Sequence, residues 1–279
     1  MDWFNFFLKD LKPNYPEILY VFSFLSIITL VGIAIFRTLL DEKRLEVVVP
    51  GGMVAGVAFY ILYLGVLSHL LKGPLGILII SLLFILSGVF LYRRKRGLFN
   101  LKFPPFGLKT LGFYVLVFLT SGVIIVKAGN AQWGGDAITY WGLATSFANG
   151  NYPQVLPWQP QFLTVHHQGA FLMEGAIHAI TKVDIRVVHF LFVAFIIFAG
   201  FSLLWGLANV ETKRPILSFL APLMGYVVFG GIFIPFIKSL GWMSPQITIA
   251  TPPTLHDEKN AMVALTSFFD LYYLFPRTT

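Results

Sequence analysis

The chain has 279 residues, of which 57% are hydrophobic and 12% are charged, and its mean hydropathy is +0.77. A soluble globule of this length cannot bury so much apolar surface, so the composition predicts an integral membrane protein. The net charge of +7 is explained by basic loops, and no basic stripe interleaved with aromatics favours a nucleic-acid partner. The absence of cysteine excludes disulfides, thiolate metal sites and cysteine nucleophiles.

Residues 1–13 are rich in aromatic side chains before Lys9, which is typical of a short interfacial segment rather than of a cleaved signal peptide. Six apolar segments follow, and each has the roughly 20 residues that a helix needs to cross about 30 Å of hydrocarbon. None alternates in polarity as a barrel strand would, so we expect an all-α fold, a polytopic transmembrane bundle. A seventh span begins near Ala261. The six expected spans are 16–39, 47–71, 74–92, 108–127, 186–208 and 216–238.

Lys and Arg gather in alternate loops, after the first, third and fifth expected spans. Such loops stay in the cytoplasm, so we expect the N-terminus and the long loop 128–184 to be extracytoplasmic, together with the loop 241–258. The basic residues that set this orientation are Arg37, Lys43, Arg44, Arg93, Arg94, Lys95, Arg96, Lys102, Lys109, Lys213 and Arg214.

The loop 128–184 is predicted to hold two interfacial helices joined by a proline-rich strap. The first helix covers 136–149 and is ended by Gly150, in the turn Asn149-Gly150-Asn151-Tyr152-Pro153. Prolines at 153, 157 and 160 keep the next stretch extended. The second helix covers about 168–182, which is too short to span the membrane, and its composition suits the interface.

Asp136 lies in the segment Trp133-Gly134-Gly135-Asp136, between an apolar span and the first loop helix. A carboxylate flanked by glycines and aromatics can approach a substrate closely while bulk water is kept away. The alternative is that Asp136 caps a helix that starts at Ala137. The two interpretations are compatible, because a cap also fixes the position of the carboxylate.

Three further groups of polar residues are candidates for chemistry. His166 and His167 precede the second loop helix, where imidazoles can bind phosphate oxygens or relay protons. Glu174 and His178 are four residues apart on one helical face, so with His167 they suit a metal site, or else they are interfacial polar residues. Asp257 and Glu258 precede the seventh span, where the helix dipole favours them or where they converge with Asp136 on one cleft.

The order of these motifs resembles that of the GT-C superfamily of membrane glycosyltransferases, over about 108–275. The resemblance divides the chain into extra transmembrane helices at 1–107 and a GT-C-like core at 108–279. The family's His-Pro-Pro-like segment reads His-Gln-Gly here. Family members usually continue through further spans, so we expect the core to be incomplete at its C-terminus: it is a fragment, or a partner completes it, or it is a shortened relative that no longer catalyses. The matching motifs are Asp136-Ala137-Ile138-Thr139-Tyr140, Asn149-Gly150-Asn151-Tyr152-Pro153, His166-His167-Gln168-Gly169 and His256-Asp257-Glu258.

The resemblance implies that a sugar is moved from a polyprenyl-phosphate donor to an acceptor at the extracytoplasmic face, with inversion at the anomeric carbon. It implies that Asp136 acts on the acceptor as general base or orients it. The resemblance also implies that the lipid phosphate is bound by His166, His167 and Lys259. A divalent metal ion or a sugar hydroxyl would be held by Asp257 and Glu258. The sugar or the isoprenoid would stack on Trp133, Tyr140 and Trp141, unless these aromatic residues are plain interface anchors.

The competing interpretation is a non-catalytic integral membrane subunit or scaffold of a larger membrane complex. Its helices would then bury the surface of other membrane subunits. A transporter is the third interpretation. Transporters usually bind their coupling ions with a charged residue well inside the hydrocarbon, and no expected span carries one. Membrane lipids are partners in every case.

The orientation can be tested with single cysteines, because the natural chain has none. We expect an impermeant thiol reagent added to intact cells to label Ser146→Cys, in the outer loop, and to leave Arg96→Cys, in a basic loop, unlabelled until the membrane is opened. Labelling of Arg96→Cys but not of Ser146→Cys on intact cells would overturn the orientation.

Overall fold

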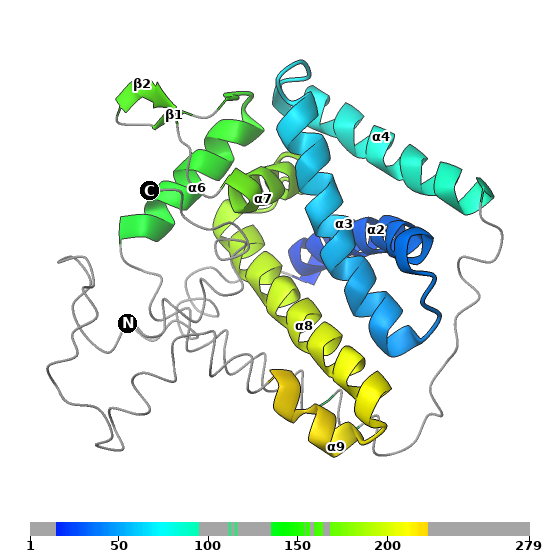
Figure 1. Ribbon diagram of the computed structural model, residues 1–279. Coiled ribbons are helices and arrows are strands. Elements are labelled where there is room, and N and C mark those ends of the chain that lie inside the picture. The colour runs from blue at the N-terminus through cyan, green and yellow to red at the C-terminus, as the bar shows by residue number, and fades with distance from the viewer. Residues whose placement is uncertain are drawn as a thin grey trace, which may run out of the picture.

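The computed structural model describes residues 15–94, 112, 115, 135–153, 155–156, 159–163 and 168–222. These residues form a helical bundle with one short hairpin (Figure 1). The predicted spans at 16–39, 47–71, 74–92 and 186–208 are confirmed as helices, whereas those at 108–127, 216–238 and from Ala261 lie largely or wholly outside the described residues. Among the described residues, four helices are long and apolar enough to cross a membrane: α2 (Tyr15–Leu40), α3 (Leu45–Leu67), α4 (Gly73–Arg94) and α8 (Ile185–Thr212).

Glu42 organises the short connection between α2 and α3. Its Oε1 accepts hydrogen bonds from the backbone N–H groups of Lys43 (2.8 Å) and Arg44 (2.9 Å), and from Nε of Arg44 (2.9 Å). Its Oε2 accepts from Nη2 of Arg44 at 2.6 Å. The hydrogen bonds from the Arg44 side chain lower the pKa of Glu42 from 4.5 to about 2, so the carboxylate stays charged and keeps the turn closed.

Three glycines bring the backbones of α2 and α3 into direct contact. A Cβ atom at Gly32 of α2 would overlap the carbonyl oxygen of Gly52 and the backbone of Gly56, both in α3. A Cβ atom at Gly56 would overlap the carbonyl oxygen of Ile28. Gly52 and Gly56 are four residues apart and therefore share one helical face, as in the small-residue motifs that pack helices in membranes.

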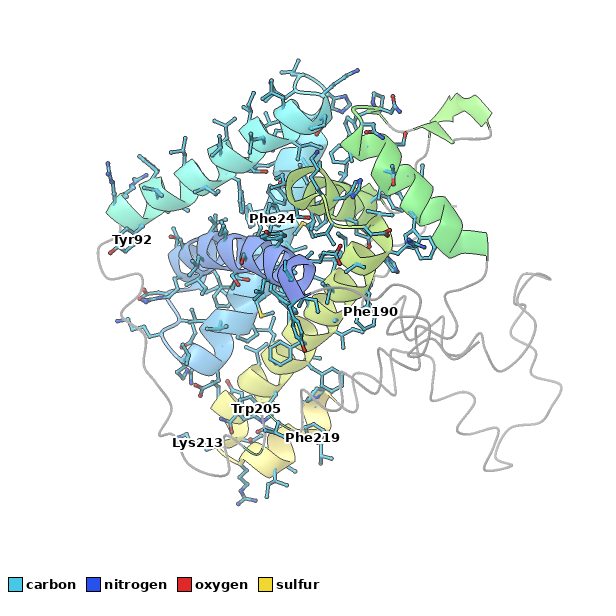
Figure 2. The ribbon with its side chains drawn as sticks, turned by 180° about the vertical axis from the view of Figure 1, so that it is seen from behind. Phe24, Tyr92, Phe190, Trp205, Lys213 and Phe219 are labelled. Carbon is cyan, nitrogen blue, oxygen red and sulfur yellow. The ribbon has the colours of Figure 1, made fainter. Side chains whose placement is uncertain are left out.

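The other long helices are placed on this pair. Figure 1 shows α8 beside α3, and their ends meet where Gly206 lies against the carbonyl oxygen of Glu46. Figure 2, seen from behind, shows α2 lying across both. On the other side of the bundle, α4 contacts α2 through Gly88 and α3 through a buried 2.6 Å hydrogen bond between the hydroxyls of Tyr60 and Ser81. A short helix, α9 (Pro215–Ser218), follows α8.

The two helices predicted in the loop 128–184 are confirmed as α6 (Gly135–Ala148) and α7 (Gln168–Thr181). The interfacial position expected for α7 stays a prediction. Within the bundle this helix contacts α2, α3, α4, α6 and α8, and residues 171–177 are buried on all sides of it, the polar Glu174 included, as in an interior helix. The buried apolar residues of α7 are Phe171, Leu172, Met173, Ala176, Ile177 and Ala179.

The proline-rich strap between α6 and α7 is extended, as predicted, and its residues also pair. Strands β1 (Val155–Leu156) and β2 (Gln159–Leu163) form an antiparallel hairpin with an irregular register. Pro160 is tolerated in β2 because a two-stranded hairpin consists of edge strands. The sequence pattern predicted the extended backbone but not this pairing.

The backbone contact between α2 and α3 predicts that a side chain at Gly56 lowers the stability of the protein. We expect Gly56→Ala to destabilise the protein by about 1–3 kcal/mol, because the new methyl group must push the α2 backbone away. The matched control is Gly142→Ala in α6, where a Cβ atom meets nothing within 4 Å. There the better helix propensity of alanine should leave stability unchanged or raise it by up to about 1 kcal/mol. Thermal unfolding in detergent measures both, and equal behaviour of the two variants would contradict the close contact.

Candidate functional site

The candidate site begins at the N-terminus of α6. The helix starts at Gly135, so Asp136 belongs to its first turn rather than to a cap in front of Ala137. A carboxylate in the first turn is favoured by the helix dipole, which also stabilises its charged form. Tyr140 lies one turn further along the same helix. The side chains of both residues are outside the described part of the structure.

Six further predicted site residues lie outside the described residues. His166 and His167 immediately precede α7 in the sequence, which begins at Gln168. The expected meeting of Asp136 with the second acidic motif therefore stays a prediction, as does the metal site there. The other residues concerned are Trp133, Asp257, Glu258 and Lys259.

Helix α6 is held against α7 by a close backbone approach. A Cβ atom at Gly175 of α7 would meet the carbonyl oxygen of Ala144 and the ring of Phe147, both in α6. Leu143, Ala144 and Phe147 are buried, whereas Gly142 is exposed, so over residues 141–148 α6 packs through one face.

The turn after α6 has the form that the sequence predicts. Gly150 adopts a φ of 97°, a left-handed conformation that glycine reaches without strain, and its N–H donates to the Phe147 carbonyl at 2.9 Å. The Tyr152 hydroxyl then donates to the Gly65 carbonyl of α3 at 3.0 Å, and the Tyr152 ring packs edge-on against His69 with centroids 4.8 Å apart. The turn thereby fastens the end of α6 to the end of α3.

Glu174 and His178 share one face of α7 but have different partners. Nδ1 of His178 donates to the carbonyl oxygen of Val183 at 2.7 Å, which ties the end of α7 to the start of α8. Glu174, only 1% exposed, bonds through Oε1 to Nδ1 of His189 in α8 at 2.8 Å. Among the described residues, no three His, Asp or Glu side chains are grouped to hold a metal ion.

Three helices meet at this buried pair. The Trp141 ring of α6 faces the His189 ring of α8 at a centroid distance of 6.3 Å and an interplanar angle of 77°, and His189 in turn bonds to Glu174 of α7. The stacking of Trp141 on the sugar or the isoprenoid, or its role as an interface anchor, stays a prediction, and His189 is not among the residues singled out from the sequence. His189 is 15 residues from Glu174, so no helical spacing links them, and only the turn between α7 and α8 brings them together.

A second acidic residue at a helix start is fully described. Asp184 caps α8, and its Oδ1 accepts the backbone N–H of Arg186 at 2.9 Å. Its carboxylate also binds the Arg186 guanidinium, with Oδ2 2.7 Å from Nη2, and these hydrogen bonds lower the pKa of Asp184. Asp184 is therefore committed to a local structural role.

Comparison of the chain with protein-family models, with curated proteins and with solved structures finds no match.

The Tyr152 contact predicts a pH-dependent stability. Burial raises the pKa of Tyr152 above its ordinary value of 10.0, so the stability that its neutral phenol contributes is complete below pH 10.0 and is lost as the pH rises through the raised pKa. We expect Tyr152→Phe to cost about 1 kcal/mol near neutral pH, because the Gly65 carbonyl loses its donor.

The difference between Tyr152→Phe and the unchanged protein should become smaller as the pH is raised above 10.0, because only the unchanged protein has the phenol to ionise. Unfolding in detergent, followed from neutral to alkaline pH, measures this difference. A difference that is constant or grows with pH would contradict the buried hydroxyl contact.

Proposed function

We propose that the chain is an integral membrane glycosyltransferase, which moves a sugar from a polyprenyl-phosphate donor to an acceptor at the extracytoplasmic face. The observation that supports this most directly is the position of Asp136, in the first turn of a short helix that is packed on a bundle of membrane-length helices. A carboxylate that acts on a bound acceptor must be held in a fixed position, because a small displacement of a catalytic group greatly lowers the reaction rate.

In the proposed reaction, the acceptor hydroxyl oxygen attacks the anomeric carbon of the donor sugar. The bond from that carbon to the phosphate oxygen breaks, and its electron pair stays on the polyprenyl phosphate. Asp136 takes the hydroxyl proton as general base. His166, His167 and Lys259 are proposed to stabilise the charge that develops on the leaving phosphate.

The proposed roles of the second acidic motif and of the aromatic residues complete the site. Asp257 and Glu258 are proposed to bind a divalent cation or a sugar hydroxyl, since carboxylate oxygens suit both ligands. Trp133 and Tyr140 are proposed to contact the sugar ring or the isoprenoid, because aromatic faces pack well on apolar rings and chains.

Asp136→Asn tests the proposal. Asparagine keeps the size and the helix-start preference of aspartate but cannot take a proton, so we expect transfer of radiolabelled sugar from a polyprenyl-phosphate donor in membranes to fall about 10²- to 10⁴-fold. The thermal stability of the variant should be nearly unchanged.

Asp184→Asn is the matched control, because it removes the same charge from the start of another helix. We expect it to retain transfer, since Asp184 is paired with Arg186. Equal transfer by Asp136→Asn and the unchanged protein would rule out the general base. Absence of transfer by the unchanged protein with every lipid-linked donor would favour the non-catalytic subunit instead.

A further inference from the structure

We propose that Glu174 and His189 are a positioning pair, which fixes the N-terminal part of α6 against α7 and α8 through Trp141. The consequence for sugar transfer rests on the proposed function of Asp136. The positioning itself does not, and it can be measured without any activity.

The pair is buried and joins two helices. The side chains of His189 and Glu174 are 11% and 2% exposed, and their 2.8 Å contact joins two helices that diverge from a short turn. Oε2 of Glu174 makes no hydrogen bond to the described residues, so His189 is the partner that orients this carboxylate. Removing one member of such a buried pair leaves the polar group of the other without its partner, which is strongly destabilising.

The carboxylate also orients the imidazole ring. Because Nδ1 of His189 is bonded to Glu174, the ring is fixed in its plane and presents a fixed surface to the Trp141 ring. A carboxylate commonly orients a histidine in this way when the ring must hold a defined position. Trp141 thus rests on a histidine that cannot rotate freely.

Trp141 is the contact that matters for Asp136. The described side chains of α6 are those of residues 141–148, and Trp141 is the nearest of them to Asp136 along the helix, about 7.5 Å at 1.5 Å per residue. The Gly175 contact lies further along α6, at Ala144 and Phe147. The Gly175 contact therefore fixes the middle of α6 against α7. The Trp141 contact limits the displacement of the first turns of α6 relative to α8.

The position of α6 can be measured with spin labels on an otherwise cysteine-free chain. Gly142→Cys on the exposed side of α6 and Leu207→Cys on the exposed side of α8 give one distance between the two helices. We expect a narrow distance distribution in the unchanged background, and a broadened or shifted one in Glu174→Leu and in His189→Leu. Glu174→Gln should stay narrow, because its amide oxygen still accepts from Nδ1 of His189.

Two further variants separate positioning from general stability. Tyr60→Phe removes the buried hydrogen bond to Ser81 between α3 and α4, so it should lower stability and leave the distance distribution narrow. Trp141→Leu keeps both members of the buried pair and removes the aromatic contact between His189 and α6, so it should broaden the distribution even if both leucine variants of the pair fail to fold.

Sugar transfer gives the second measurement. We expect kcat to fall about 10- to 100-fold in Glu174→Leu and Trp141→Leu with KM little changed, because a misplaced Asp136 affects the chemical step more than donor binding. Glu174→Gln should keep most of kcat, and Tyr60→Phe should keep all of it per folded molecule.

The outcomes are distinguishable. A narrow, unshifted distribution in Trp141→Leu and in the folded leucine variants of the pair would overturn the positioning pair. A changed distribution with unchanged kcat would overturn its link to catalysis. Absence of transfer by the unchanged protein would defeat the proposed function alone, because the spin-label distances would still report on the pair.

Discussion

The contact between the α2 and α3 backbones at Gly32, Gly52 and Gly56 is the constraint on which the arrangement of the bundle depends. In a bilayer, apolar side chains gain nothing by leaving lipid for protein, so helices associate through close packing and polar contacts. Glycine allows the closest packing, because it lets backbone atoms touch. With α2 and α3 fixed in this way, α8 is placed by the contact of Gly206 with α3, and α4 by the contact of Gly88 with α2.

The enclosed helix α7 follows from this arrangement. With 14 residues it is too short to cross about 30 Å of hydrocarbon, yet it lies among the long helices. Its buried Glu174 bonds to His189 through Oε1, and its half-buried His178 bonds to the Val183 carbonyl, as polar groups in an interior generally find partners. Helix α6, which carries Asp136, is thus supported by contacts with α7 and α8.

The ionisable residues form two kinds of pair. At the ends of the long helices, Glu42 pairs with Arg44 and Asp184 with Arg186, each within two residues, so these pairs organise helix starts. In the interior, Glu174 and His189 pair across 15 residues and connect separate helices.

The four membrane-length helices, the two short helices of the loop 128–184 and the turn at Gly150 could be predicted from the sequence alone, because hydropathy, helical period and the left-handed preference of glycine are local properties of the chain. The sequence also placed Asp136 at a helix start. Only the tertiary structure decided that α7 is interior, that Trp141 rests on a histidine and that Glu174 is bonded to His189. These depend on how the turn between α7 and α8 and the glycine contacts set the helices against one another, and such long-range packing has no periodic signal in the sequence.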